Sequence, residues 1–117
     1  MISLEGRQIY VYTQPVDMRK SINGLSVLLS SIFQKDPLSK DLFLFTNRAR
    51  NKLKCLVWDT NGFVLYYKRL EKGRFHYSRL LQGEEIVITV QQLHALLIGL
   101  DFYLLGESSH SSYSEFF

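Results

Sequence analysis

The dipeptide Asn61-Gly62 separates two runs rich in apolar and aromatic residues, 52–59 and 63–70, and constrains the fold more than any other feature of the sequence. Both central residues of a type I′ turn need positive φ, which Asn and Gly tolerate, so this pattern is a strong signal of a β-hairpin. A two-residue loop at Asn61-Gly62 sets Lys54 directly opposite Arg69. The sequence therefore predicts an antiparallel sheet built around this hairpin.

Other segments rich in β-branched and aromatic residues predict further strands. The expected strands cover residues 8–13, 42–45 and 85–89, with a short additional strand at 75–77. Polar or Pro-containing stretches separate these segments, as is typical of turns and loops.

Two helices are expected in addition to the strands. In the first, apolar residues recur three and four positions apart over 22–33, with Asp17 or Ser21 as the N-cap. The second begins with a Thr89-x-x-Gln92 capping box. The order of elements predicts an α+β fold, with an antiparallel sheet of about five to six strands and two packed helices.

Length and composition indicate one domain. The chain has 117 residues, of which 46% are hydrophobic, enough for a core without disulfides or metals. We expect a single α+β domain over residues 1–106 and a flexible Ser-rich tail over 107–117. Because Cys55 is the sole cysteine, and the sequence has neither a signal-peptide layout nor a run of about 18 apolar residues, we expect a cytoplasmic protein without membrane contact.

Basic residues concentrate in the middle of the chain. Residues 48–79 contain nine Lys and Arg against two acidic residues, whereas the whole chain has 14 against 11. Alternate turns of an up-and-down sheet lie at the same end, so the turns at 47–51 and 71–74 are expected side by side. Lys54 and Arg69 then face each other as like charges, an arrangement that is more tolerable when the partner is a polyanion.

This clustering predicts a nucleic-acid-binding surface that contacts phosphates. The predicted contact residues are Arg48, Arg50, Lys52, Lys54, Lys68, Arg69, Lys72 and Arg74, with Arg19 and Lys20 extending the surface. A solvated basic edge that only blocks strand-to-strand aggregation is the alternative interpretation. Trp58, Tyr66 and Tyr67 are candidates for stacking on bases, although aromatic residues in a central hairpin more often belong to the core.

No catalytic constellation stands out in the sequence. The acidic candidates for a two-metal site each fit a helix end, a turn or a strand start better; they are Asp17, Asp59, Asp101 and the pair Glu84-Glu85. The three His residues are too scattered for a metal triad, and no neighbouring base accompanies Cys55. We therefore expect no catalytic residues, no metal and no cofactor.

Several separated motifs occur in a specific order along the chain. They are DMRKSINGL at 17–25, NRARNKLK at 47–54, Trp58-Asp59, Gly62-Phe63, YKRLEKGRF at 67–75 and the segment 91–103. In this order they resemble the TnpB (second open reading frame) accessory proteins of the IS-sixty-six-type insertion sequences, over most of residues 8–103. One departure is visible, because that family often continues Arg-Phe with Trp-Pro and this chain has Phe75-His76-Tyr77.

The resemblance implies a small protein that a mobile element encodes beside a separate, larger transposase, which carries the acidic catalytic residues. It implies no relation to the RNA-guided nucleases that share the TnpB name. The leading hypothesis is non-catalytic DNA binding in transposition, either to transposon ends or without sequence preference, with the transposase of the same element as a further partner. The alternative is an interaction subunit that binds the transposase without contacting DNA, and a nuclease ranks below both. The oligomeric state stays open.

Overall fold

Five strands form a single sheet in the order β4-β3-β2-β1-β5 in the structure, a computed structural model that describes residues 3–76 and 83–100. The elements along the chain are β1 (Ile9–Tyr12), α1 (Ile22–Ser31), β2 (Leu42–Thr46), β3 (Lys52–Asp59), β4 (Gly62–Arg69), β5 (Glu85–Ile88) and α2 (Val90–Leu97). The predicted α+β class is confirmed. Within the described residues, neither α1 nor α2 is long and apolar enough to span a bilayer.

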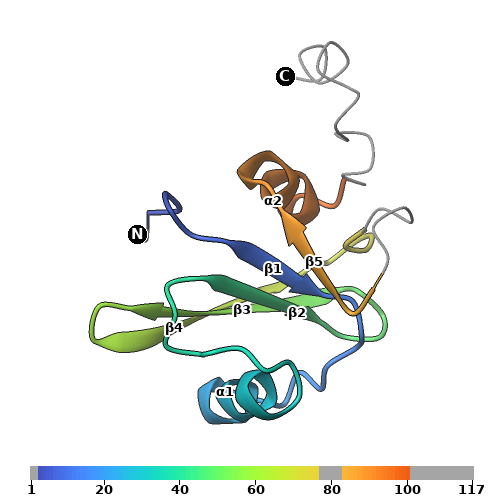
Figure 1. Cartoon of the computed structure of the whole chain (residues 1–117). Coiled ribbons are helices and arrows are strands. Elements are labelled where there is room, and N and C mark those ends of the chain that lie inside the picture. Colours follow the sequence, from blue (N-terminus) through green and yellow to red (C-terminus); the bar gives the residue numbers. More distant parts are fainter. Residues whose placement is uncertain (1–2, 77–82, 101–117) are drawn as a thin grey trace.

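The two helices pack on opposite faces of the sheet (Figure 1). On the face covered by α1, Leu25 and Leu29 of the helix pack with Tyr12 and Phe45 of the strands. The face covered by α2 carries the alternate strand residues, so its core is formed by small and branched apolar side chains such as Leu44. Because both faces of β2 are covered, all five of its residues are buried, and the first four form a continuous apolar run.

The sheet is mixed and not purely antiparallel as expected. β1 pairs with β2 in parallel, with Ile9 opposite Leu42 and Tyr12 opposite Phe45, whereas the other three strand pairs are antiparallel. A parallel pair needs a long crossover connection, and the segment containing α1 supplies it. Both strands therefore end at the same end of the sheet.

The β3–β4 hairpin forms, but its register differs by two residues from the expected one. Asp59 is opposite Gly62, which makes Thr60 and Asn61 the two-residue loop, and Thr60 adopts a positive φ of 55°. The predicted pair of Lys54 and Arg69 was therefore wrong. A shift of two residues preserves the face that each side chain occupies, since the side-chain period of a strand is two.

The strand predicted at residues 75–77 was wrong for Phe75 and His76, and Tyr77 lies outside the described residues. Phe75 makes one backbone hydrogen bond, from its N–H to the carbonyl of Arg50 at 2.7 Å, and its ring is buried in the core beneath α2. The aromatic residue therefore fastens the chain after β4 onto the core, without pairing with a strand. The tail predicted over 107–117 also lies outside the described residues.

The predicted side-chain cap is absent from α1 and present in α2. Ser21 is the N-cap residue of α1, but neither its hydroxyl nor the Asp17 carboxylate caps the helix; Asp17 instead binds Arg19. In α2 the capping box is complete, because the Thr89 hydroxyl accepts the Gln92 N–H at 3.1 Å and the Gln92 side chain accepts the Thr89 N–H at 2.9 Å. The sequence prediction for the start of α2 is thus confirmed.

Replacing Thr89 by Ala should lower the free energy of unfolding by about 1 kcal/mol, because the Gln92 N–H in the first turn of α2 loses its acceptor. Thr89→Ser keeps the hydroxyl and should stay close to the wild type. Urea unfolding followed by circular dichroism measures both variants. Equal effects of Ala and Ser would contradict the assigned capping role.

Candidate functional site

Three chain segments meet at one end of the sheet, after β1, β2 and β4. The N–H of Val16, in the segment after β1, donates to the carbonyl of Thr46 at 2.9 Å. The N–H of Leu70, after β4, donates to the carbonyl of Asn51 at 2.8 Å, and Phe75 bonds to Arg50 in the same turn. The turn at 47–51 thus bonds to the segment after β4, and Thr46, just before it, bonds to the segment after β1, which confirms that the turns after β2 and β4 share one end.

The 47–51 turn is closed by one side chain. The Asn47 carbonyl oxygen Oδ1 accepts the N–H groups of Asn51 and Lys52 at 3.0 and 3.1 Å, and Asn47 Nδ2 donates to Asn51 Oδ1 at 2.7 Å. Arg50 adopts a positive φ of 57° within this turn. A turn held by this many bonds presents its flanking basic residues from a fixed backbone. Sequence reasoning missed this role of Asn47, although Asn is a common turn former.

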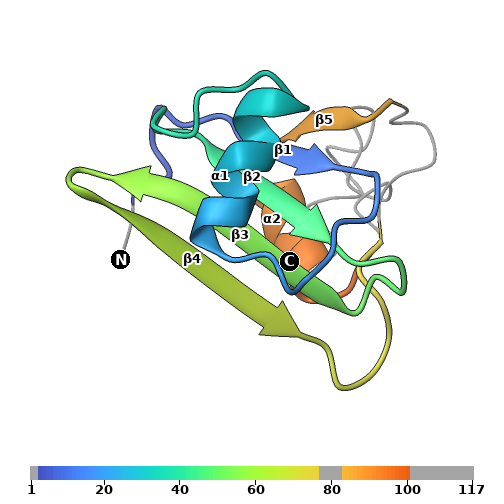
Figure 2. The same ribbon diagram turned by 90° about the horizontal axis from the view of Figure 1, so that it is seen from below.

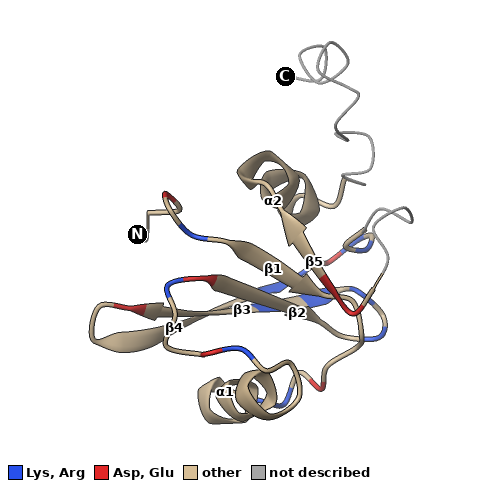
Figure 3. Ribbon diagram, in the orientation of Figure 1, with Lys and Arg blue, Asp and Glu red and all other residues tan. Residues whose placement is uncertain are grey.

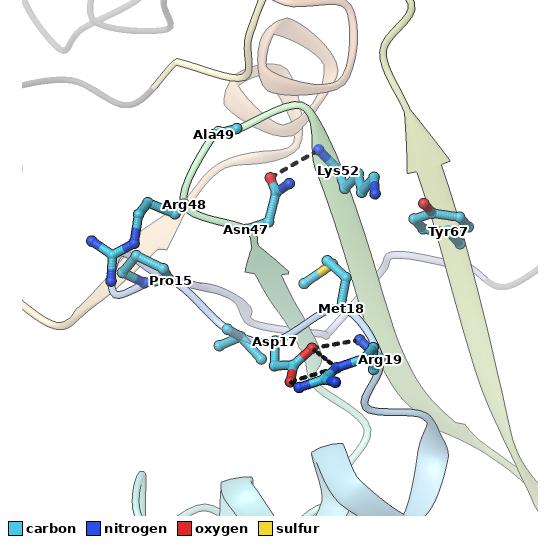
Figure 4. A pocket seen from close by; sticks show the side chains of 10 residues that line it. Pro15, Asp17, Met18, Arg19, Asn47, Arg48, Ala49, Lys52 and Tyr67 are labelled. Atoms are coloured by element: carbon cyan, nitrogen blue, oxygen red, sulfur yellow. Dashed lines mark hydrogen bonds and ion pairs between the residues drawn. The ribbon is translucent and has the colours of Figure 1, made fainter.

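A groove of about 660 Å³ lies between this turn and the segment after β1 (Figure 4). Its walls come from residues 15–19 on one side and 47–49 on the other, and Lys52 and Tyr67 complete it from β3 and β4. In Figure 4, Arg48 lies beside Pro15 at one end of the groove and Lys52 lies toward Tyr67 at the other. The structure thus brings Arg48, Lys52 and Arg19 of the predicted set around one hollow.

Tyr67 gives the groove an aromatic wall. The residue is 53% exposed, and the ammonium of Lys54, its cross-strand neighbour, lies 5.5 Å from the ring centroid. Lys52 is on the same face of the hairpin and is paired with Arg69, so a like-charge pair exists there, two residues away from the expected one. This side of the groove therefore combines positive charge with an accessible aromatic ring.

Lys54 has a structural role. Its ammonium donates to the carbonyls of Met18 at 2.7 Å and Lys20 at 2.8 Å. These two bonds tie the segment between β1 and α1 to the middle of β3. Lys54 therefore holds the segment that forms one wall of the groove. Two of its three N–H donors are already engaged in these bonds.

Two of the predicted arginines are paired with carboxylates two residues away. Arg19 forms an ion pair with Asp17 at 2.7 Å, and Arg69 forms one with Glu71 at 3.0 Å. The side-chain and backbone hydrogen bonds from Arg19 lower the pKa of Asp17 from 3.8 to about 2. In the same way, the hydrogen bond and charge of Glu71 raise the pKa of Arg69. Each pair is close to neutral overall, so neither adds a full positive charge.

Lys68 lies apart from the groove, on the face of the sheet that α2 covers. Its ammonium donates to the carbonyl of Leu97 at 2.6 Å, at the end of α2. Because alternate residues of β4 point to opposite faces, Lys68 cannot share a surface with Tyr67 and Arg69. Its expected place in one cluster with Lys54 and Arg69 was wrong, and its bond to the helix end is favourable because the C-terminus of a helix attracts cations.

The remaining predicted residues are all exposed; Arg50, Lys72 and Arg74 belong to the turns at this end of the sheet, and Lys20 precedes α1 beside the middle of β3. Figure 3 shows blue segments on the turn between β2 and β3 and on the adjoining ends of β3 and β4. The positive charge concentrated in the sequence thus lies on the β2–β3–β4 side of this sheet end, which we call the basic end, while Glu84 and Glu85 lie at the same end of the sheet beside β1.

The other candidate groups are engaged elsewhere. Among residues 3–76 and 83–100, no group of three or more His, Cys, Asp or Glu side chains gathers as a metal site would require. Glu85 accepts a hydrogen bond from the Tyr12 hydroxyl at 3.0 Å and forms an ion pair with Lys35 at 3.2 Å. Cys55 is 6% exposed, and burial raises the pKa of its thiol to about 12, which leaves it protonated at neutral pH. Asp101 lies outside the described residues.

A second groove, of about 370 Å³, opens on the opposite face between α2 and the β3–β4 hairpin. Its lining is almost entirely apolar and includes Leu4, Leu53, Leu93 and Leu97, with Tyr66 at 43% exposure. Tyr66 lines only this second groove, whereas Tyr67, whose side chain points to the opposite face of β4, borders both grooves.

The family described as IS66 Orf2 like protein matches residues 7–106. The chain belongs to this family. Membership confirms the resemblance drawn from the motifs and identifies a transposition-associated accessory protein of an insertion sequence. The family is not a known family of enzymes.

Two relatives from Sinorhizobium fredii (strain NBRC 101917 / NGR234) match along most of their length. The uncharacterized protein y4jC is 36% identical over 97 residues, covering 83% of this chain and 82% of the relative. The uncharacterized protein y4hO is 33% identical over 95 residues, covering 81% and 82%. No solved structure matches this IS66 Orf2 like protein significantly.

Removing the Lys54 ammonium should loosen the groove wall. Lys54→Met retains the aliphatic stem but leaves the Met18 and Lys20 carbonyls without this donor, so the free energy of unfolding should fall by about 1–3 kcal/mol. Lys52→Met removes the same charge from the same face and should change it by less than about 0.5 kcal/mol. Urea unfolding separates the two variants, and an equal loss would contradict the structural role of Lys54.

The Asp17–Arg19 pair predicts a defined pH dependence. Since the folded-state pKa of Asp17 lies below its ordinary value, the pair stabilises the fold above pH 3.8, and this contribution disappears as the pH falls toward 2. In an NMR titration, the Asp17 carboxyl should have its midpoint near 2. Arg19→Ala should raise the midpoint toward the ordinary value but leave it below, because the backbone N–H of residue 19 still donates to Asp17. An unchanged midpoint would show that the Arg19 side chain is not a cause of the low pKa.

Proposed function

We propose that this IS66 Orf2 like protein acts in transposition as a non-catalytic DNA-binding protein, and that DNA phosphates bind at the basic end of the sheet. The groove between residues 15–19 and 47–49 is the centre of this surface. Arg48 and Lys52 are its principal phosphate contacts, and Arg50, Lys72 and Arg74 extend it. Lys54 holds the wall in place, and Lys68 takes no part.

The observation that carries the proposal is a groove with two cationic side chains in its lining, one from the turn after β2 and one from the start of β3. Arg48 and Lys52 line it, and neither forms an ion pair with another described residue. The single carboxylate in the lining, Asp17, is already neutralised by Arg19. The groove is therefore positive where a phosphate would enter, and phosphate contacts of this kind supply most of the affinity of non-specific DNA binding.

Contacts to phosphates position a protein on DNA but carry no sequence information. We therefore expect little difference in affinity between a transposon-end duplex and a scrambled duplex, together with a steep dependence on salt. Recognition of the transposon end then belongs to the transposase, which we propose as the protein partner.

One observation favours the alternative function, a subunit that binds the transposase without contacting DNA. Leu4, Leu97 and Tyr66 line the open apolar groove beside α2. Contiguous apolar surface of this kind often marks a protein interface. A pull-down with the transposase in the presence of nuclease distinguishes the two. Association that survives nuclease favours the protein interface, and association that is lost favours DNA.

The DNA proposal is tested by fluorescence anisotropy with a labelled duplex at several salt concentrations. Arg48→Ala and Lys52→Ala should each weaken binding to every duplex and reduce the slope of log K against log salt by about 1, because each removes one phosphate contact. Lys40→Ala removes an exposed charge just before β2, at the opposite end of the sheet, and should leave the slope unchanged.

Equal effects of all three variants would mean that net charge alone drives the binding, and that the groove is not the site. A complete absence of binding at low salt would remove the DNA proposal and leave the apolar groove as the functional surface.

A further inference from the structure

We propose that the basic groove binds single-stranded DNA, with one unpaired base stacked on the ring of Tyr67. This inference rests on the proposed function, since it identifies the form of DNA that the groove takes. The ligand class is an unpaired nucleotide flanked by phosphates, of any base identity.

Tyr67 lies where the sheet is uncovered. Figure 2, which views the sheet from the side of α1, shows that no helix lies over the second half of β4. The apolar packing beneath α1 reaches Phe63 and Leu65 in the first half of β4 and stops there. Tyr67 and Arg69 follow on the same face with 53% of Tyr67 exposed, so the ring is not a core residue.

The ring is held from one side. Lys54 faces Tyr67 across the hairpin, and its ammonium is fixed by the Met18 and Lys20 carbonyls while lying 5.5 Å from the ring centroid. A cation near an aromatic face restrains the ring and leaves its other surface free for a ligand. An aromatic side chain pre-positioned in this way is what stacking on a base requires.

Positive charges flank the ring along the groove. Lys52 lies diagonally across the hairpin from Tyr67, and Figure 4 shows the two side chains at the same end of the groove. Arg48 lies at the other end. A strand that places a base on Tyr67 thus has cationic side chains on the path of its backbone, which is the combination of stacking platform and charged groove found in single-strand-binding proteins.

The stacking geometry excludes an intact duplex from the ring. Inside a duplex both faces of each base are covered by neighbouring base pairs, so a ring on the protein surface finds no free face except at the duplex ends. A duplex can still place phosphates on Arg48 and Lys52, but it gains nothing from Tyr67. The single strand should therefore bind more tightly than the duplex at equal phosphate content.

Anisotropy titrations with labelled oligothymidine, an abasic strand of equal length and a duplex of equal length test the inference. Tyr67→Ala should weaken oligothymidine binding by about tenfold or more and leave the duplex and the abasic strand unaffected, because neither presents a base to the ring. Tyr67→Phe retains the ring and should bind nearly as well as the wild type. Tyr66→Ala is the matched control, since it removes the adjacent, similarly exposed tyrosine from the opposite face.

The outcomes separate the two proposals. Equal wild-type affinity for oligothymidine, abasic strand and duplex, with no effect of Tyr67→Ala, overturns the stacking inference and leaves phosphate binding intact. A loss of affinity in Tyr66→Ala as large as in Tyr67→Ala also overturns it, because the effect would not belong to the groove. Circular dichroism melting of each variant shows that the comparison is made between folded proteins.

Discussion

The parallel pairing of β1 with β2 determines where the functional end of this molecule lies. Two parallel strands end at the same end of a sheet, so the segment after β1 and the turn after β2 are brought side by side. β4 runs in the same direction as β2, because two antiparallel pairings separate them, and its end arrives at the same place. The hydrogen bonds from Val16, Leu70 and Phe75 then fasten these segments together. Without the parallel pair, the groove would have one wall.

The lysines of the β3–β4 hairpin have two different roles: some hold elements of the fold together, and another is available to a ligand. Lys54 engages two backbone carbonyls, and Lys68 engages the end of α2, so both hold elements together. Lys52, on the same face of β3 as Lys54, engages no carboxylate among the described residues. A basic cluster in a sequence therefore contains side chains of different kinds, and only their partners in the fold show which ones are available to a ligand.

Local patterns predicted much of this fold. The Thr89 capping box, the apolar stripe of α1 and the hairpin all depend on residues close in sequence, and the two turns at one sheet end follow from strand order. The parallel β1–β2 pairing could not be predicted in this way, because it joins residues more than 30 positions apart. The loop at Thr60 and Asn61 was missed because Thr rarely adopts positive φ, and Asn61-Gly62 offered the more common solution. The groove could not be predicted from local sequence patterns, because Tyr67 and Asn47 acquire their roles through contacts with residues of other segments.

The burial of Cys55 has a practical consequence for studying this protein in solution. Its thiol is shielded by the core beneath α2 and stays protonated at neutral pH, while thiol-directed dyes react with exposed thiolates. A cysteine introduced on the surface of the folded chain would thus be labelled selectively, with the native cysteine left in place. A fluorophore or spin label can be placed beside the 47–51 turn without altering the core, and a distance from that turn to a partner can be measured on an otherwise unmodified chain.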